Sequence, residues 1–294
     1  MRRKDTRRPD RFVDLLAGAA SGGTQHCLDL ETEYHTPMTP TLNDLETLAR
    51  QAGDILRAGY GRRPQIHYKG VIDLVTDVDH QSEDFLIGEI RRSFPEHAIV
   101  TEESGVLAGQ DCCVWYIDPL DGTVNFAHGV PLFAVSIGYA EEGELRFGAV
   151  YEPLRDEMFL AERGRGAWLN GQPIHASAVD NLDQSLLVTG FPYDIRTHPE
   201  NNLDQFTRFM LLSQGVRRLG SAALDLCYVA AGRLDGFWEV RLKPWDVAAG
   251  GLIAQEAGAA VSDTLGGPGF LHSPCSILAC APGIQAQMLV VLNG

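Results

Sequence analysis

No stretch of the 294-residue chain approaches the roughly 20 consecutive apolar residues that a membrane-spanning helix requires. The basic residues at its start, MRRKDTRRPDRF, are not followed by the apolar stretch that a secretory signal contains. We therefore expect a cytoplasmic protein with no membrane partner.

The chain also lacks a C-x-x-C pair or any other cysteine spacing typical of a zinc site. Its six cysteines are scattered along the sequence, at Cys27, Cys112, Cys113, Cys227, Cys275 and Cys280. We interpret them as reduced, mostly buried thiols without a chemical role. The nine histidines form no H-x-x-x-H pair, so we interpret most of them as surface or structural residues.

Positive charge is scarce: 24 lysines and arginines face 39 aspartates and glutamates, which gives a formal net charge of −15. A nucleic-acid-binding protein needs a basic face to displace the counterions of the phosphates. The charge therefore argues against direct nucleic-acid binding. A chain this acidic that acts on a phosphorylated small molecule would need metal cations in its pocket.

Hydrophobic residues make up 45% of the chain, enough for one large domain or for two packed lobes. Residues 1–40 show no sustained periodicity and predict a flexible N-terminal extension. An amphipathic pattern then predicts a helix from Leu42 to Tyr60-Gly61, capped by Thr41 or Asn43. A second helix is expected from about Gln81 to Phe94.

Strand patterns separated by glycine-bearing turns follow, and GRGAWLNG (164–171) is typical of a hairpin rather than a nucleotide loop. Residues 41–184 are thus predicted to form an α+β lobe. From residue 185 to 294, short strands alternate with helices, which favours an α/β lobe. No low-complexity linker separates the two lobes, so we expect them to pack tightly and to share a site.

Carboxylates recur at the predicted ends of strands and helices. They fall in four segments, namely Asp73, Asp77 and Asp79; Glu102 and Glu103; Asp118 and Asp121; and Asp246. Acids that converge in a cleft repel one another unless cations lie between them. Magnesium prefers oxygen ligands, and two such ions about 4 Å apart can hold both the attacking and the leaving oxygen of a displacement.

The segment WYIDPLDGTVNF (115–126) shows how such a site could be built. A proline fixes a turn after the strand, so Asp118 and Asp121 can face the same ions while the carbonyl of Leu120 adds an oxygen ligand. Gly122 permits close approach of the backbone, and the amides of Gly122 and Thr123 can point at a phosphate.

Two other interpretations of this segment remain open. D-P-x-D-G is also a common surface β-turn, although that interpretation leaves the acids of the other segments unexplained. The haloacid-dehalogenase phosphatases carry a similar D-x-D-G-T nucleophile motif. The spacing here is D-x-x-D, which makes an aspartyl-phosphate nucleophile less favoured.

Four stretches together resemble the inositol monophosphatase family: DLVTDVD (73–79), TEESG (101–105), and the segments 115–138 and 219–258. The resemblance extends from about Leu42 to the C-terminus. It implies a layered αβαβα sandwich of the inositol monophosphatase and fructose-1,6-bisphosphatase type, of mixed α+β and α/β class. It also implies a lithium-sensitive homodimer that uses two to three Mg²⁺ ions.

The resemblance also implies roles for individual residues. The metal ligands would be Glu102, Asp118, the carbonyl of Leu120, Asp121 and Asp246, with Asp118 bridging two ions. The catalytic residues would be Glu102, which a third ion shares, and Thr123 and Asp79, which orient or help to deprotonate the attacking water. The substrate contacts would be Asp121, Gly122, Thr123, Ala222, Glu239 and Asp246.

The activity that this resemblance implies is hydrolysis of inositol 1-phosphate to inositol and phosphate by metal-activated water. Alternative substrates within the superfamily are fructose 1,6-bisphosphate, histidinol phosphate, 3′-phosphoadenosine 5′-phosphate and NADP. A non-enzymatic alternative is an interaction with the transcription machinery, which a member of this family can make.

Overall fold

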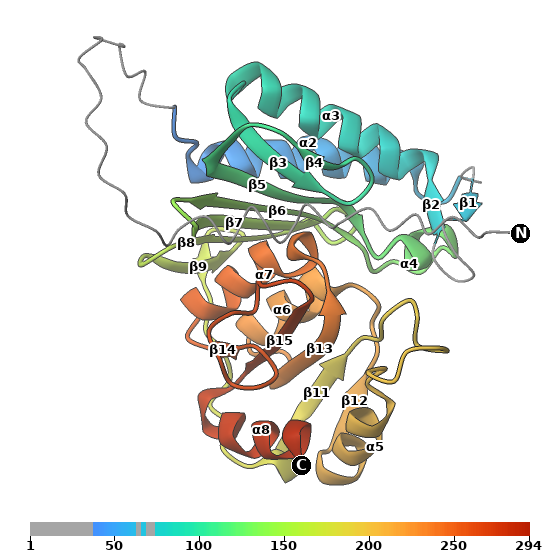
Figure 1. Ribbon diagram of the computed structural model, residues 1–294, viewed down its shortest axis with the longest axis vertical. Coiled ribbons are helices and arrows are strands. Elements are labelled where there is room, and N and C mark those ends of the chain that lie inside the picture. Colours follow the sequence, from blue (N-terminus) through green and yellow to red (C-terminus); the bar gives the residue numbers. More distant parts are fainter. Residues whose placement is uncertain (1–37, 63–65, 69–73) are drawn as a thin grey trace, which may run out of the picture. The chain divides into compact units, whose positions relative to one another are not determined.

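Two β-sheets alternate with three layers of helices in the computed structural model, which describes residues 38–62, 66–68 and 74–294 (Figure 1). Helices α2 (Leu42–Gly59) and α3 (Asp77–Ser93) cover the outer face of the larger sheet. Helices α6 (Ala222–Ala230) and α7 (Pro244–Glu256) lie between the two sheets. Helices α5 (Leu203–Leu212) and α8 (Gln285–Asn293) form the last layer. The αβαβα order implied by the sequence resemblance is therefore present.

The larger sheet has eight strands in the described part of the chain, in the order β10-β9-β8-β7-β6-β5-β3-β4. Their bounds are β3 His97–Thr101, β4 Gly105–Leu107, β5 Gln110–Asp121, β6 Ala134–Glu141, β7 Glu144–Glu152, β8 Glu157–Glu162, β9 Gly166–Leu169 and β10 Gln172–Pro173. All neighbours are antiparallel except β3 and β5, which run parallel. Strands β9 and β10 form the predicted hairpin.

The smaller sheet has the order β12-β11-β13-β15-β14. Its strands are β11 Leu186–Thr189, β12 Gly215–Arg217, β13 Gly236–Leu242, β14 Ala260–Ser262 and β15 Cys275–Cys280. Strand β11 runs parallel to both β12 and β13, which is the alternating α/β pattern expected for this half of the chain. A separate pair, β1 (Ile66–Tyr68) and β2 (Leu74–Thr76), precedes α3.

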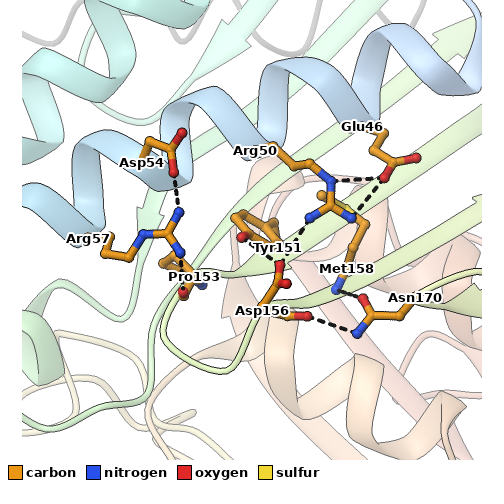
Figure 2. Close-up of polar contacts among 9 residues, drawn as sticks. All are labelled: Glu46, Arg50, Asp54, Arg57, Tyr151, Pro153, Asp156, Met158 and Asn170. Atoms are coloured by element: carbon orange, nitrogen blue, oxygen red, sulfur yellow. Dashed lines mark hydrogen bonds and ion pairs between the residues drawn. The ribbon is translucent and has the colours of Figure 1, made fainter.

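Helix α2 begins where the sequence predicts, because Thr41 and Asp44 form a reciprocal capping box. Its apolar side is buried against the sheet, and polar contacts along its flank add to this packing (Figure 2). Arg50 pairs with Glu46 at 2.9 Å on its own helix and with Asp156 at 3.0 Å beyond the end of β7. These pairs are partly exposed, so burial of the apolar face dominates the stability of this contact.

Helix α3 begins at Asp77, four residues before the predicted start at about Gln81. The side chain of Thr76 accepts hydrogen bonds from the backbone N–H groups of Val78 and Asp79, and the Asp79 carboxylate accepts one from the Thr76 backbone. The apolar periodicity does not predict this capping box, because it becomes regular only after the first turn of the helix. The correction places Asp79 inside the helix, at its third position.

Helix α7 is apolar on nearly all sides because it is covered by a sheet on both faces. It approaches the larger sheet closely at two glycines of β6 and β7. A Cβ atom on Gly138 would lie 2.9 Å from the Cβ of Ala248, and one on Gly148 would lie 2.8 Å from the backbone oxygen of Ala249. These two glycines therefore set the distance between α7 and the sheet.

The described part of the chain contains no helix with the length and apolar character needed to cross a membrane. The expected N-terminal extension, residues 1–40, lies outside the described residues except for its last three positions. Asp73 also lies outside them.

We predict that Gly148→Ala destabilises the protein by about 1–3 kcal/mol, because the added methyl group meets backbone atoms of α7 that cannot rotate away. The matched control is Gly88→Ala on the exposed side of α3, where no atom lies within 4 Å of the new Cβ. Since alanine is the better helix former, this control should be neutral or stabilising. Urea unfolding of both variants measures the difference, and equal midpoints would contradict the close-packing argument.

Candidate active site

One cavity of about 360 Å³ brings together acids from the ends of elements that are far apart in the sequence. Its lining includes nine of the ten residues predicted for the site, namely Glu102, Asp118, Leu120, Asp121, Gly122, Thr123, Ala222, Glu239 and Asp246. The tenth, Asp79, contacts the lining residue Thr123 through a hydrogen bond of 3.0 Å. Asp77 and Glu103, also noted in the sequence, are not among the lining residues.

The carboxyl end of β5 carries Asp118 and Asp121 on a local bulge. Asp118 pairs with Ser136 and Asp121 with Ala134, so β5 advances three residues while β6 advances two. The Asp118 carboxylate accepts a hydrogen bond of 3.0 Å from the Leu120 backbone N–H, which closes the turn after the strand. The predicted turn is therefore present, although its residues are buried rather than exposed.

The turn ends at Gly122, whose φ of 93° lies in the left-handed region. A Cβ atom at this position would also lie 2.9 Å from the carbonyl oxygen of Leu132. Both the backbone angle and the close approach therefore require glycine. The short helix α4 (Thr123–Ala127) begins immediately afterwards.

Asp121 connects the larger sheet to the helical layer between the two sheets. Its carboxylate accepts hydrogen bonds from the Ser221 hydroxyl at 2.5 Å and from the Ala223 backbone N–H at 2.8 Å, both at the start of α6. The Ser221 oxygen in turn caps α6 by accepting a hydrogen bond from Leu224. Residues about 100 positions apart in the sequence thereby hold one another in place.

Asp79 and Thr123 form a second buried contact. One carboxylate oxygen of Asp79 accepts hydrogen bonds from Thr76, and the other accepts one from the Thr123 hydroxyl. The Thr123 hydroxyl also lies 3.0 Å from the carbonyl oxygen of Leu120. Because a hydroxyl has one proton, it can donate to only one of these two acceptors at a time. Burial raises the pKa of Asp79, although its hydrogen bonds oppose this effect.

Glu83 was missed by the sequence reasoning. This glutamate of α3 is 2% exposed, and its carboxylate accepts hydrogen bonds from the hydroxyls of Thr101 and Ser104. It also accepts hydrogen bonds from the backbone N–H groups of Glu103 and Ser104. Glu83 thus orders the loop that presents Glu102 to the cavity. Its position one helical turn after Asp79 was the only available signal.

Asp246 occupies the third position of α7. Its carboxylate accepts a hydrogen bond of 2.7 Å from the Lys243 backbone N–H, and Pro244 begins the helix. The packing of α7 against Gly138 and Gly148 therefore also determines where this carboxylate lies.

The acids strongly affect one another's ionisation. Burial is the main cause that raises the pKa of Asp118 well above its usual range, and the charges of Glu102, Asp121 and Asp246 raise it further. Burial also raises the pKa of Asp121 to about 6, against the lowering effect of the Ser221 hydrogen bond. The pKa of Asp246 is raised by burial and by Glu102, Asp121 and Glu239. This mutual repulsion calls for a compensating positive charge.

Hard cations fit this donor set, which consists of carboxylate oxygens and the carbonyl oxygen of Leu120. In the described part of the chain, no three histidine, cysteine, aspartate or glutamate side chains converge closely enough to form a ready-made ion site. The fit therefore rests on the chemistry of the donors and on their mutual repulsion.

Other residues that line the cavity are suited to contact a polar organic group. Glu239 of β13 is 7% exposed. Gly190 leaves room for this side chain, since a Cβ atom on Gly190 would lie 2.1 Å from the Glu239 carboxylate. Asp225 of α6 also lines the cavity, with a buried carboxylate oxygen that has no partner among the described residues. No local pattern in the sequence predicts that Asp225 lies at the cavity. Burial raises the pKa of both Asp225 and Glu239, and Arg218, which also lines the cavity, opposes this effect.

Known proteins resemble this chain in both sequence and fold. The sequence model of the inositol monophosphatase family matches residues 38–292. A curated relative, Nus factor SuhB from Pasteurella multocida, is 46% identical over 259 residues, which cover 86% of this chain and 95% of the relative.

Two solved structures support the same relationship. Inositol monophosphatase from Anabaena is 42% identical with a TM-score of 0.77, covering 85% of this chain and 94% of that one. Extragenic suppressor protein suhB from Bartonella henselae is 38% identical with a TM-score of 0.81, covering 86% and 98%. The chain belongs to the inositol monophosphatase family.

Proposed function

We propose that this protein is a magnesium-dependent phosphomonoesterase that hydrolyses a small polyol phosphate, with inositol 1-phosphate as the first candidate. The observation that carries the proposal is the meeting of Glu102, Asp118, Asp121 and Asp246 in one buried cavity. Burial and neighbouring acids raise the pKa of Asp118 and Asp246, so the folded chain holds together carboxyls whose charged forms a bound cation would stabilise. Membership of the family supports the same reaction class.

Glu102, Asp118, Asp121, Asp246 and the carbonyl of Leu120 would hold the metal. Bound Mg²⁺ would supply Lewis acidity toward the phosphoryl group and the water, and would neutralise the charge that develops on the leaving oxygen. The backbone of Gly122 and Thr123 would bind phosphate oxygens, because the left-handed conformation at Gly122 leaves their N–H groups at the start of α4.

Thr123 and Asp79 would together accept the proton of the attacking water. The Thr123 hydroxyl donates its hydrogen to a carboxylate oxygen of Asp79, which leaves the Thr123 oxygen able to accept a hydrogen bond from water. A proton can then pass through the hydroxyl to Asp79, whose pKa is raised by burial. The nucleophile is water, and no phosphoenzyme forms.

Glu239 and the backbone of Ala222 would contact the hydroxyls of the polyol. At pH 7 the Glu239 carboxyl is largely protonated, since burial raises its pKa to about 8, and it can both donate and accept. Such a group is suited to a substrate that presents adjacent hydroxyls.

Phosphate release over a substrate panel tests the proposal. Inositol 1-phosphate should be hydrolysed faster than fructose 1,6-bisphosphate, histidinol phosphate, 3′-phosphoadenosine 5′-phosphate or NADP. Activity should require Mg²⁺, disappear with a chelator and fall with added Li⁺. Preference for another member of the panel would support the proposed reaction class with a different substrate. Inactivity on all of these compounds would refute the proposal.

A second candidate function is an interaction with the transcription machinery, which the name of the 46% identical Nus factor SuhB favours. The two functions are separable, because neutralising one metal ligand would abolish hydrolysis without altering the surface. Retained binding of the Asp118→Asn variant to a purified transcription complex would favour this second function.

We predict that Asp118→Asn lowers turnover on inositol 1-phosphate about a thousandfold, equivalent to about 4 kcal/mol of barrier. The amide keeps the volume but removes a charge that would compensate two ions, so the Mg²⁺ requirement should also rise. Without metal, the variant should melt at a higher temperature. Burial and neighbouring acids raise the pKa of Asp118 in the folded wild type, so this carboxyl lowers stability at neutral pH in a way that the uncharged amide does not.

The exposed Asp183→Asn is the matched control and should change neither activity nor melting temperature. A folded Asp118→Asn protein within a few-fold of wild-type activity would contradict the bridging role.

We predict that Glu239→Ala lowers kcat/KM for inositol 1-phosphate roughly tenfold, through loss of a buried hydrogen bond to the polyol. Hydrolysis of p-nitrophenyl phosphate should change less than about twofold, because that leaving group offers no hydroxyl to Glu239. Glu239→Gln should retain most activity at pH 7, since the wild-type carboxyl is largely uncharged there. An equal loss on both substrates would assign Glu239 to the phosphate side of the site instead.

A further inference from the structure

Two adjacent cysteines, Cys112 and Cys113, lie near the start of β5. Asp118 and Asp121 lie at the other end of this strand. The sulfur atoms of Cys112 and Cys113 are 3.3 Å apart, and both residues are free thiols. Neighbouring side chains of a regular strand point to opposite faces of the sheet, which keeps their ends far apart. The close approach of these two sulfurs therefore needs a local cause.

The cause is a bulge in the pairing of β5 with β3. His97 pairs with Gln110 and the next residue, Ala98, pairs with Val114, so β5 advances four residues while β3 advances one. The extra residues of β5 include both cysteines. On the other side, the Cys112 carbonyl accepts a hydrogen bond of 2.8 Å from the backbone N–H of Glu142, and Cys113 pairs with Glu141 of β6. The backbone that presents the two thiols is thus held on both sides.

The separation of the sulfurs distinguishes between two kinds of dithiol chemistry. A disulfide needs an S–S distance of about 2.05 Å and usually Cα atoms at least about 4.4 Å apart, whereas adjacent residues are limited to about 3.8 Å. An atom bound to two sulfurs at about 2.3 Å each, with an angle of about 90–110° between the bonds, separates them by about 3.3–3.8 Å. The observed 3.3 Å matches such a bridge and not a disulfide.

The surroundings allow one side of the pair to be reached. Cys112 is half-buried, whereas Cys113 is 2% exposed. The neighbouring hydroxyl of Tyr139 is fully buried, has no conventional hydrogen-bond partner among the described residues, and interacts with the Cys113 thiol. Burial raises the pKa of Cys113 to about 11, so a ligand must displace the thiol proton as it binds.

We propose that Cys112 and Cys113 form a vicinal dithiol site that binds a trivalent arsenical, a soft centre that takes two sulfurs and keeps its third substituent. With phenylarsine oxide, two S–H bonds and the arsenic–oxygen bond break and two As–S bonds form. The two thiol protons leave with the oxygen as one water molecule, and no oxidant or reductant is needed. The half-buried side of Cys112 leaves space for the third substituent. This site is independent of the proposed phosphatase activity.

Phenylarsine oxide added to the folded full-length protein tests the site. Mass spectrometry should show one bridging adduct per chain that survives excess glutathione and is removed by dithiothreitol, because two sulfurs must be displaced together. Cys112→Ser should weaken binding roughly 100-fold or more by removing this chelation. This substitution is at the half-buried position, so the variant should keep its urea unfolding midpoint.

Two matched controls test two of the four other thiols. Cys27→Ser and Cys275→Ser should each keep the glutathione-resistant adduct. Cys113→Ala, checked by the same urea unfolding, should lose it as Cys112→Ser does. Absence of a resistant adduct in the wild type, or its persistence in folded Cys112→Ser, would overturn the proposal.

Discussion

The burial of several carboxylates around one cavity is the constraint on which the rest of this structure depends. Burial raises the pKa of Asp118, Asp121 and Asp246, and acidic neighbours raise the pKa of Asp118 and Asp246 further. A chain can keep such groups together only where other interactions outweigh their repulsion. Here those interactions are hydrogen bonds that the acids accept from backbone and hydroxyl groups, and the close packing of the helices that carry them.

The middle helical layer connects this constraint to the fold. Helices α6 and α7 lie between the two sheets, and their first residues meet the carboxyl end of β5 (Figure 1). Asp121 accepts hydrogen bonds from the start of α6, and Asp246 stands at the start of α7. Each helix therefore serves both as core and as support for the site. Each end of β5 carries a bulge. The bulge near Asp118 shapes the cavity, and the bulge at the other end brings Cys112 and Cys113 together.

Much of the fold was predictable because its elements carry local signals. The Thr41 cap, the hairpin of β9 and β10 and the alternation of strands and helices after residue 185 all followed from sequence patterns. The start of α3 did not, because its capping box precedes the regular apolar pattern. Glu83, Asp225 and the close sulfurs of Cys112 and Cys113 were also missed. Each depends on contacts or strand pairing that no local pattern encodes.

The order of amino acids specifies which chemical groups are available, since the D-P-x-D-G turn, the acids at element ends and the scarcity of positive charge are properties of the chain. It also determined the family, through long motifs whose residue types and spacing resemble those of inositol monophosphatases. The contacts of Asp121 with Ser221 and of Asp79 with Thr123 arise only when the chain folds. The physical reason is that ionisation and hydrogen bonding depend on distance and burial, which are set by packing between residues far apart in the sequence.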